Sequence, residues 1–143
     1  MKEQTRLIVA LDVDTLEDAV GLVDSIGPAV EWYKVGKQLF TRHGPAAVKI
    51  LKERQKRVFL DLKFHDIPNT VAQAVRSSAA VGADMVNIHI SGGPAMCRAA
   101  AGAAAESDVM LIGVTVLTSM NEEELSAVGV PADPASQVVN LAN

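Results

Sequence analysis

Two acidic residues and a lysine follow a short apolar run near the middle of the sequence. Asp61, Lys63 and Asp66 come directly after the run 58–60. Residues two apart on a strand point to the same face, so Asp61 and Lys63 are expected to lie side by side. Buried charges are costly unless they are paired, and a core strand does not ordinarily end in three of them. This pattern predicts the polarised site of an α/β enzyme at the carboxyl end of a strand.

Further polar residues stand where other apolar runs end. Asp12 follows the run 7–11, Lys34 lies near the end of 30–35, and Thr118 follows 109–117. Ordinary structural interpretations also exist. Asp12 is typical of a turn, and Asp61 and Lys63 can form a structural ion pair. Their shared position at strand ends favours function.

The elements that must position these residues can be read from hydrophobic periodicity. Apolar runs alternate with segments of helical spacing, which predicts a parallel sheet covered by helices. The first run is continuous, as in a strand buried on both faces. The expected strands are 7–11, 30–35, 58–62, 85–90 and 109–117, and helices are expected to begin near Thr15, Gly44, Pro68, Gly92, Asn121 and Asp133.

Two architectures fit this alternation. An open doubly wound sheet of the flavodoxin type suits the length, because a complete (β/α)₈ barrel takes about 250 residues. It does not account for polar residues at the ends of four different strands, which a barrel gathers around one mouth. We therefore expect an α/β TIM barrel of which only about the first five βα units are present, forming a single partial domain over residues 1–143.

Composition narrows the class of protein. The 143 residues are 49% hydrophobic and 3% aromatic, with a net charge of −4. These values exclude a disordered chain and argue against nucleic acid or an acidic membrane as partner. The single cysteine, Cys97, excludes an internal disulfide. Residues 1–6 are polar and no apolar run reaches transmembrane length, so neither a signal peptide nor a membrane span is expected, and a cytoplasmic location follows.

The segment from Asp61 to Pro68 resembles the Asp-x-Lys-x-x-Asp signature of the orotidine 5′-phosphate decarboxylase family. The resemblance continues, in order, through residues 10–12, 34–36, 86–93 and 114–119. It implies a TIM-barrel homodimer with shared active sites. Such an enzyme converts orotidine 5′-monophosphate (OMP) to UMP and carbon dioxide in de novo pyrimidine biosynthesis, without a cofactor or a metal.

The resemblance also implies roles for individual residues. Lys63 becomes the proton donor to C6 of the pyrimidine, Asp61 lies beside the substrate carboxylate, and Lys34 completes the charge array. Asp66 is supplied to the site of the neighbouring subunit. The substrate-binding residues implied are Asp12 at the ribose hydroxyls, Lys34, Asp61, Thr118 at the pyrimidine ring, and Ile67 and Thr70 in the segment that lines the neighbour's site.

Other functions stay open at this point. A related decarboxylase acting on keto-gulonate phosphate shares the Asp-x-Lys-x-x-Asp pattern but uses magnesium. His89 is expected to be a structural histidine, since no His-x-His or His-Glu-x-x-His spacing supports a metal site. An inactive half barrel that serves in binding or assembly is the remaining alternative.

The expected barrel lacks three of its eight strands. In the family these last strands and loops supply the residues that bind the phosphate of the substrate, and nothing after Thr118 matches them. We therefore expect either a fragment or the ordered part of a longer chain. A natural chain that stops at Asn143 would have weak or no decarboxylase activity, because remote phosphate contacts supply binding energy that the reaction needs.

Overall fold

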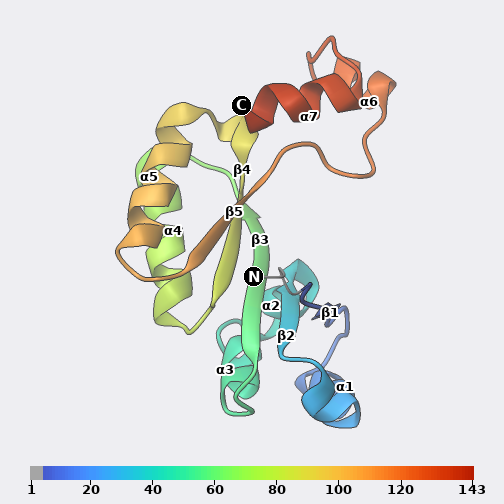
Figure 1. Cartoon of the computed structure of the whole chain (residues 1–143), viewed down its shortest axis with the longest axis vertical. Coiled ribbons are helices and arrows are strands. Elements are labelled where there is room, and N and C mark those ends of the chain that lie inside the picture. Colours follow the sequence, from blue (N-terminus) through green and yellow to red (C-terminus); the bar gives the residue numbers. More distant parts are fainter. Residues whose placement is uncertain (1–4) are drawn as a thin grey trace.

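A computed structural model describes residues 5–143 (Figure 1). The residues 1–4, on which the expected lack of a signal peptide partly rests, lie outside the described part. None of the helices in residues 5–143 combines the length and the apolar character that crossing a bilayer demands.

Five parallel strands form one sheet whose spatial order follows the chain order, β1-β2-β3-β4-β5. A flavodoxin-like sheet has its first strand inside the sheet, with neighbours added on both sides. The observed order is that of a barrel wall, so the flavodoxin-like alternative is wrong. The strands are β1 (Ile8–Ala10), β2 (Trp32–Gly36), β3 (Arg57–Phe64), β4 (Met85–His89) and β5 (Met110–Val114).

Helices connect successive strands and pack on one face of the sheet. Figure 1 shows α4 and α5 lying side by side along this face, whereas α6 and α7 project beyond the strand ends. The helices are α1 (Leu16–Ile26), α2 (Lys37–His43), α3 (Ala46–Lys52), α4 (Pro68–Ala80), α5 (Pro94–Ala105), α6 (Glu122–Ala127) and α7 (Pro134–Ala142); short 3₁₀ turns, η1 and η2, occupy Gly27–Ala29 and Ile90–Gly92.

The core lies between the helices and one face of the strands. Side chains alternate along β2, so that Tyr33 and Val35 join the buried cluster while Lys34 between them points to the other face. Leu60 of β3 and Val86 of β4 belong to the same cluster. The opposite face of the strands is therefore not part of this core and can carry polar residues. Lys34 and Asp61 lie on that face.

The first strand differs from expectation. The run 7–11 was predicted to be buried on both faces, yet Ile8 is 37% exposed and Leu7 66% exposed. The reason is position, because β1 is an edge of the described sheet and pairs only with β2. Leu11, just past the strand, is buried in the helix-side core.

The second helical region and the fifth strand also differ. One helix was expected after Gly44, but α2 comes first and ends at Gly44, whose φ of +56° reverses the chain into α3. The short α2 has only two large apolar residues, Leu39 and Phe40, so it leaves no helical periodicity to detect. The strand expected at 109–117 ends at Val114, where its pairing partner β4 also ends at His89.

Candidate active site

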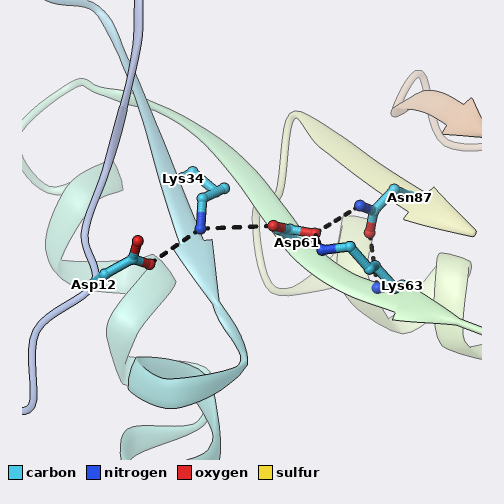
Figure 2. Close-up of polar contacts among 5 residues, drawn as sticks. All are labelled: Asp12, Lys34, Asp61, Lys63 and Asn87. Atoms are coloured by element: carbon cyan, nitrogen blue, oxygen red, sulfur yellow. Dashed lines mark hydrogen bonds and ion pairs between the residues drawn. The ribbon is translucent and has the colours of Figure 1, made fainter. Parts of the chain in front are cut away.

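Four charged residues from three successive segments meet on the open face of the sheet (Figure 2). Lys34 Nζ lies 3.1 Å from Asp12 Oδ1 and 3.6 Å from Asp61 Oδ2. The other carboxylate oxygen of Asp61 accepts a hydrogen bond of 2.6 Å from Lys63 Nζ. We call Asp12, Lys34, Asp61 and Lys63 the charge array. The expectation that Asp61 and Lys63 lie side by side is confirmed.

The register of the strands brings the array together. Gly36 of β2 is aligned with Asp61 of β3, and Ala10 of β1 is aligned with Lys34. Asp12, two residues beyond Ala10, therefore comes level with Gly36 and Asp61. Lys34 lies two residues before Gly36 on the same face of β2. Its long side chain extends towards the carboxyl end of the strand and lies between the two carboxylates, as the ion pairs require.

Gly36 provides the space that this arrangement needs. A Cβ atom at this position would lie 3.1 Å from Lys34 Nζ and 3.6 Å from Asp12 Oδ1. A side chain at residue 36 would thus crowd the Lys34 ammonium, which would have to shift by a few tenths of an ångström. A glycine two residues after a strand lysine is a sequence signal of such a close approach.

Lys63 occupies an irregular part of β3. The pairing of β3 with β4 shifts between Leu60 and Phe64, where β3 advances four residues while β4 advances two. Within this bulge Lys63 has a φ of +54°, in the left-handed region that costs a non-glycine residue about 1–2 kcal/mol. Strain of this kind is held only where surrounding contacts fix it, and it concentrates at functional sites.

Asn87 holds this bulge and was missed as a site residue. Its Oδ1 accepts a hydrogen bond from the backbone N–H of Lys63 at 2.8 Å, and its Nδ2 donates to Asp61 Oδ1 at 2.7 Å. The side chain is almost fully buried, with 2% of the residue exposed. The available signal was a lone amide inside the apolar strand 85–90.

The electrostatics of Asp61 follow from these contacts. Burial alone would raise the pKa of its carboxyl group. Hydrogen bonds from Lys63 and Asn87, together with the positive charges of Lys63 and Lys34, outweigh burial and hold the pKa below its ordinary value of 3.8. Asp61 is therefore a carboxylate at neutral pH, fixed between two ammonium groups.

The remaining predicted residues lie apart from the array. Asp66 is exposed between β3 and α4, where its Oδ1 accepts a hydrogen bond from the Ile67 backbone N–H. Ile67 is 68% exposed, and Thr70 lies exposed in the first turn of α4. Thr118 is exposed after β5 and lines an open hollow with residues of α7. In residues 5–143 no hydrogen bond or ion pair joins these four residues to the array.

Histidines flank the site without forming a metal cluster. His65 directly follows β3, and His89 is the last residue of β4. The centroids of their rings lie 5.6 Å apart. Burial, and then the charges of His65, Lys37 and Lys63, lower the pKa of His89. Within the described residues, no three His, Cys, Asp or Glu side chains are grouped so that they could hold a metal ion.

This geometry suits a reaction in which negative charge develops and a proton is transferred. The Lys63 ammonium is partly exposed, with 27% of its side chain accessible, so a bound molecule can reach it. A fixed ammonium stabilises charge that develops beside it and can then deliver a proton. Asp61 maintains the orientation of that ammonium.

Comparisons with known proteins identify a family that matches this chain. Residues 5–143 match the family model described as "Orotidine 5'-phosphate decarboxylase / HUMPS family". The chain is 50% identical over 142 residues to an orotidine 5'-phosphate decarboxylase of Pseudomonas putida strain F1, and equally identical over 142 residues to one of Actinobacillus succinogenes. Each match covers 97% of this chain and 61% of the relative, so the chain spans about three fifths of the length of these relatives.

A solved structure shows the same fold. The crystal structure of orotidine 5'-phosphate decarboxylase from Lactobacillus acidophilus superposes with a TM-score of 0.88 at 32% sequence identity. The superposition covers 97% of this chain and 66% of that one. The five strands and their helices therefore represent part of a TIM barrel, as expected from the sequence.

Proposed function

This chain belongs to the orotidine 5′-phosphate decarboxylase family, and we propose that the protein it forms converts orotidine 5′-monophosphate to UMP and carbon dioxide. The observation that carries the proposal is the position of Asp61 between the ammonium groups of Lys34 and Lys63, on the open face of a parallel sheet. The reaction serves pyrimidine biosynthesis and takes no cofactor.

Lys63 is the proton donor in this proposal. The bond between C6 and the carboxylate breaks, its electron pair stays on C6, and carbon dioxide leaves. The pyrimidine offers no adjacent electron sink for this carbanion, so the Lys63 ammonium stabilises the charge and then transfers a proton to C6. Lysine regains its proton from solvent. An ammonium that stays protonated acts as an acid and not as a Schiff-base nucleophile.

Asp61 and Lys34 set the charge around the reacting carbon. Asp61 lies beside the substrate carboxylate, where two like charges raise the energy of the bound substrate relative to the transition state. Lys34 keeps Asp61 ionised from the other side, and its contact with Asp12 directs that carboxylate towards the ribose hydroxyls. Thr118, exposed after β5, contacts the pyrimidine ring.

The complete site is shared between two subunits. Asp66, Ile67 and Thr70 are exposed and separate from the array of their own chain, which suits residues that line the site of a neighbour. We accordingly propose a homodimer in which Asp66 extends the array of its partner. Residues 1–143 form a single part of one barrel domain in this proposal, and the enzyme acts in the cytoplasm.

Product formation tests the proposed reaction. The purified full protein is incubated with orotidine 5′-monophosphate, once with EDTA and once with magnesium, and UMP and carbon dioxide are measured. We expect the two products in equal amounts at the same rate under both conditions. A folded protein that leaves the substrate unchanged would contradict the proposal, and a strict need for magnesium would favour the keto-gulonate-phosphate type of reaction.

A further inference from the structure

The bulge in β3 removes Lys63 from the regular hydrogen-bond ladder of the sheet. Between Leu60 and Phe64 the strand carries two more residues than β4 does between Val86 and Ile88. Lys63 takes a φ of +54° within this stretch, and its backbone N–H donates to a side chain, Asn87 Oδ1, at 2.8 Å. The amide of Asn87 thus supplies the acceptor that the backbone of β4 would supply in a regular ladder.

The second bond of Asn87 connects the bulge to the charge array. Its Nδ2 donates to Asp61 Oδ1 at 2.7 Å, and this is the oxygen that accepts the 2.6 Å hydrogen bond from Lys63 Nζ. One amide therefore fixes both the backbone of the lysine and the carboxylate that orients the same lysine's ammonium (Figure 2).

Few side chains can make both contacts. The site requires an acceptor facing an N–H group and a donor facing a carboxylate, on one short and rigid side chain. An amide has both functions, whereas aspartate has only acceptors when ionised and leucine has neither. With 2% of Asn87 exposed, water has little access to replace a lost partner.

We propose that Asn87 is a positioning residue for the Lys63–Asp61 pair: it holds Lys63 in the left-handed conformation and keeps the Asp61 carboxylate oriented. It acts through these two residues and does not contact substrate. The consequence for turnover rests on the proposed decarboxylase function, whereas the consequence for Asp61 and Lys63 does not.

Two variants separate the two bonds. Asn87→Asp keeps an acceptor for the Lys63 N–H but places a second carboxylate against Asp61, so NMR titration should show one carboxyl of this pair with a raised apparent pKa. Asn87→Leu removes both bonds at similar size, and the Lys63 amide should exchange its hydrogen at least about tenfold faster, as expected when a local hydrogen bond opens. A folded Asn87→Asp protein in which neither carboxyl of the pair titrates at a raised pKa would overturn the proposal.

Ser78→Ala is the matched control. Ser78 is 4% exposed, and its hydroxyl donates to Ala74 O at 2.8 Å within α4, so this variant also loses a buried hydrogen bond. It should leave both the Asp61 titration and the Lys63 exchange at their wild-type values. Equal effects of Ser78→Ala and Asn87→Leu on Lys63 exchange would mean that general loosening explains the result and would contradict a positioning role.

A measurement on the unmodified protein needs no variant to fold. The side-chain N–H resonances of Asn87 should shift as Asp61 titrates, because the amide donates directly to that carboxylate. Resonances that stay constant through the titration of Asp61 would contradict the inferred contact.

Kinetics of the full protein then test the effect on the reaction. Asn87→Asp should lower kcat on the order of a hundredfold, as misplacement of a reacting group does, with KM nearly unchanged because Asn87 does not bind substrate. A raised KM with an unchanged kcat would contradict the assignment. If the wild-type protein does not decarboxylate OMP while the NMR results hold, the proposed function fails and the positioning of Lys63 and Asp61 by Asn87 stands.

Discussion

Asp61 organises the charge array because each of its oxygens faces a different lysine. Oδ2 lies 3.6 Å from Lys34 Nζ, and Oδ1 accepts hydrogen bonds from Lys63 and Asn87. Removal of the carboxylate charge would leave the Lys63 ammonium without this ion pair and Lys34 with Asp12 as its remaining partner in the array. The Asp61 carboxylate therefore polarises the site and also offsets the cost of placing the Lys63 ammonium there.

The lowered pKa of Asp61 makes its contribution to stability depend on pH. A carboxyl group whose pKa is lower in the folded state stabilises the fold above its ordinary value of 3.8, and this stabilisation is lost as the pH falls through the lower, folded-state pKa. Asp61→Asn should reduce the free energy of unfolding at pH 7 by about 2 kcal/mol, the scale of a hydrogen bond to a charged group.

Urea unfolding across pH provides the measurement. The difference between wild type and Asp61→Asn should narrow as the pH falls below 3.8, because the carboxyl of the unfolded chain then binds a proton more readily than the folded one does. Asp24→Asn is the control, because Asp24 pairs with Arg54 at an exposed position and should change stability by less than about 1 kcal/mol. A difference that stays constant across this pH range would contradict the electrostatic account.

At the residue level the sequence predicted the members of the charge array but not Asn87, which holds two of them in place. Asp12, Lys34, Asp61 and Lys63 were found because charges at strand ends are conspicuous and one motif spans two of them. Asn87 is uncharged and lies inside an apolar strand, so only the fold shows what its amide contacts. The functional roles assigned to the charge array and to Asp66, Ile67, Thr70 and Thr118 stay predictions.

At the level of elements, the strand ends and one bulge create the site. The alternation of β2 places Tyr33 and Val35 in the core and Lys34 on the open face, and the register then aligns Gly36 with Asp61. Periodicity predicted the strands well, because continuous apolar runs are distinctive. It did not predict the bulge at Lys63, since the positive φ arises from pairing with β4 rather than from a local turn sequence.

Misplaced elements share a physical cause. Helix α2 is too short and too polar to show a periodic face, and β5 ends where its partner strand ends rather than where the apolar run ends. The exposure of Ile8 in β1 depends on how many strands the sheet contains. Each of these features depends on contacts that are distant in sequence, which single-sequence patterns do not contain.

At the level of the whole molecule, the chain forms one wall of a barrel with a charged open face. It covers 61% of its Pseudomonas putida relative, and β1 and β5 are the two edges of the described sheet. Asp66, Ile67 and Thr70 are exposed, and within residues 5–143 no hydrogen bond or ion pair joins them to the array. The proposed homodimer assigns these residues to the site of the neighbouring subunit.

Subunit mixing tests the shared site. Full proteins carrying Asp66→Asn and Lys63→Ala should each be nearly inactive, because each dimer then lacks one component at both sites. After subunit exchange, mixed dimers contain one site with both substitutions and one intact site. Activity should recover to about a quarter of wild type if exchange is random, since half of the dimers are mixed and each has one working site of two. No recovery after confirmed exchange would contradict the shared site.

The most direct test of the central claim is the turnover of a protein without the Lys63 ammonium. Decarboxylation of orotidine 5′-monophosphate is compared in Lys63→Ala and in Lys49→Ala, which removes an exposed lysine of α3 that pairs with Glu53 at 3.8 Å. Both should fold as wild type does. Lys63→Ala should lose at least about a thousandfold in kcat, the scale of general acid catalysis with charge stabilisation, whereas Lys49→Ala should stay near wild type. Substantial turnover by a folded Lys63→Ala protein would contradict the assignment of Lys63 as the proton donor.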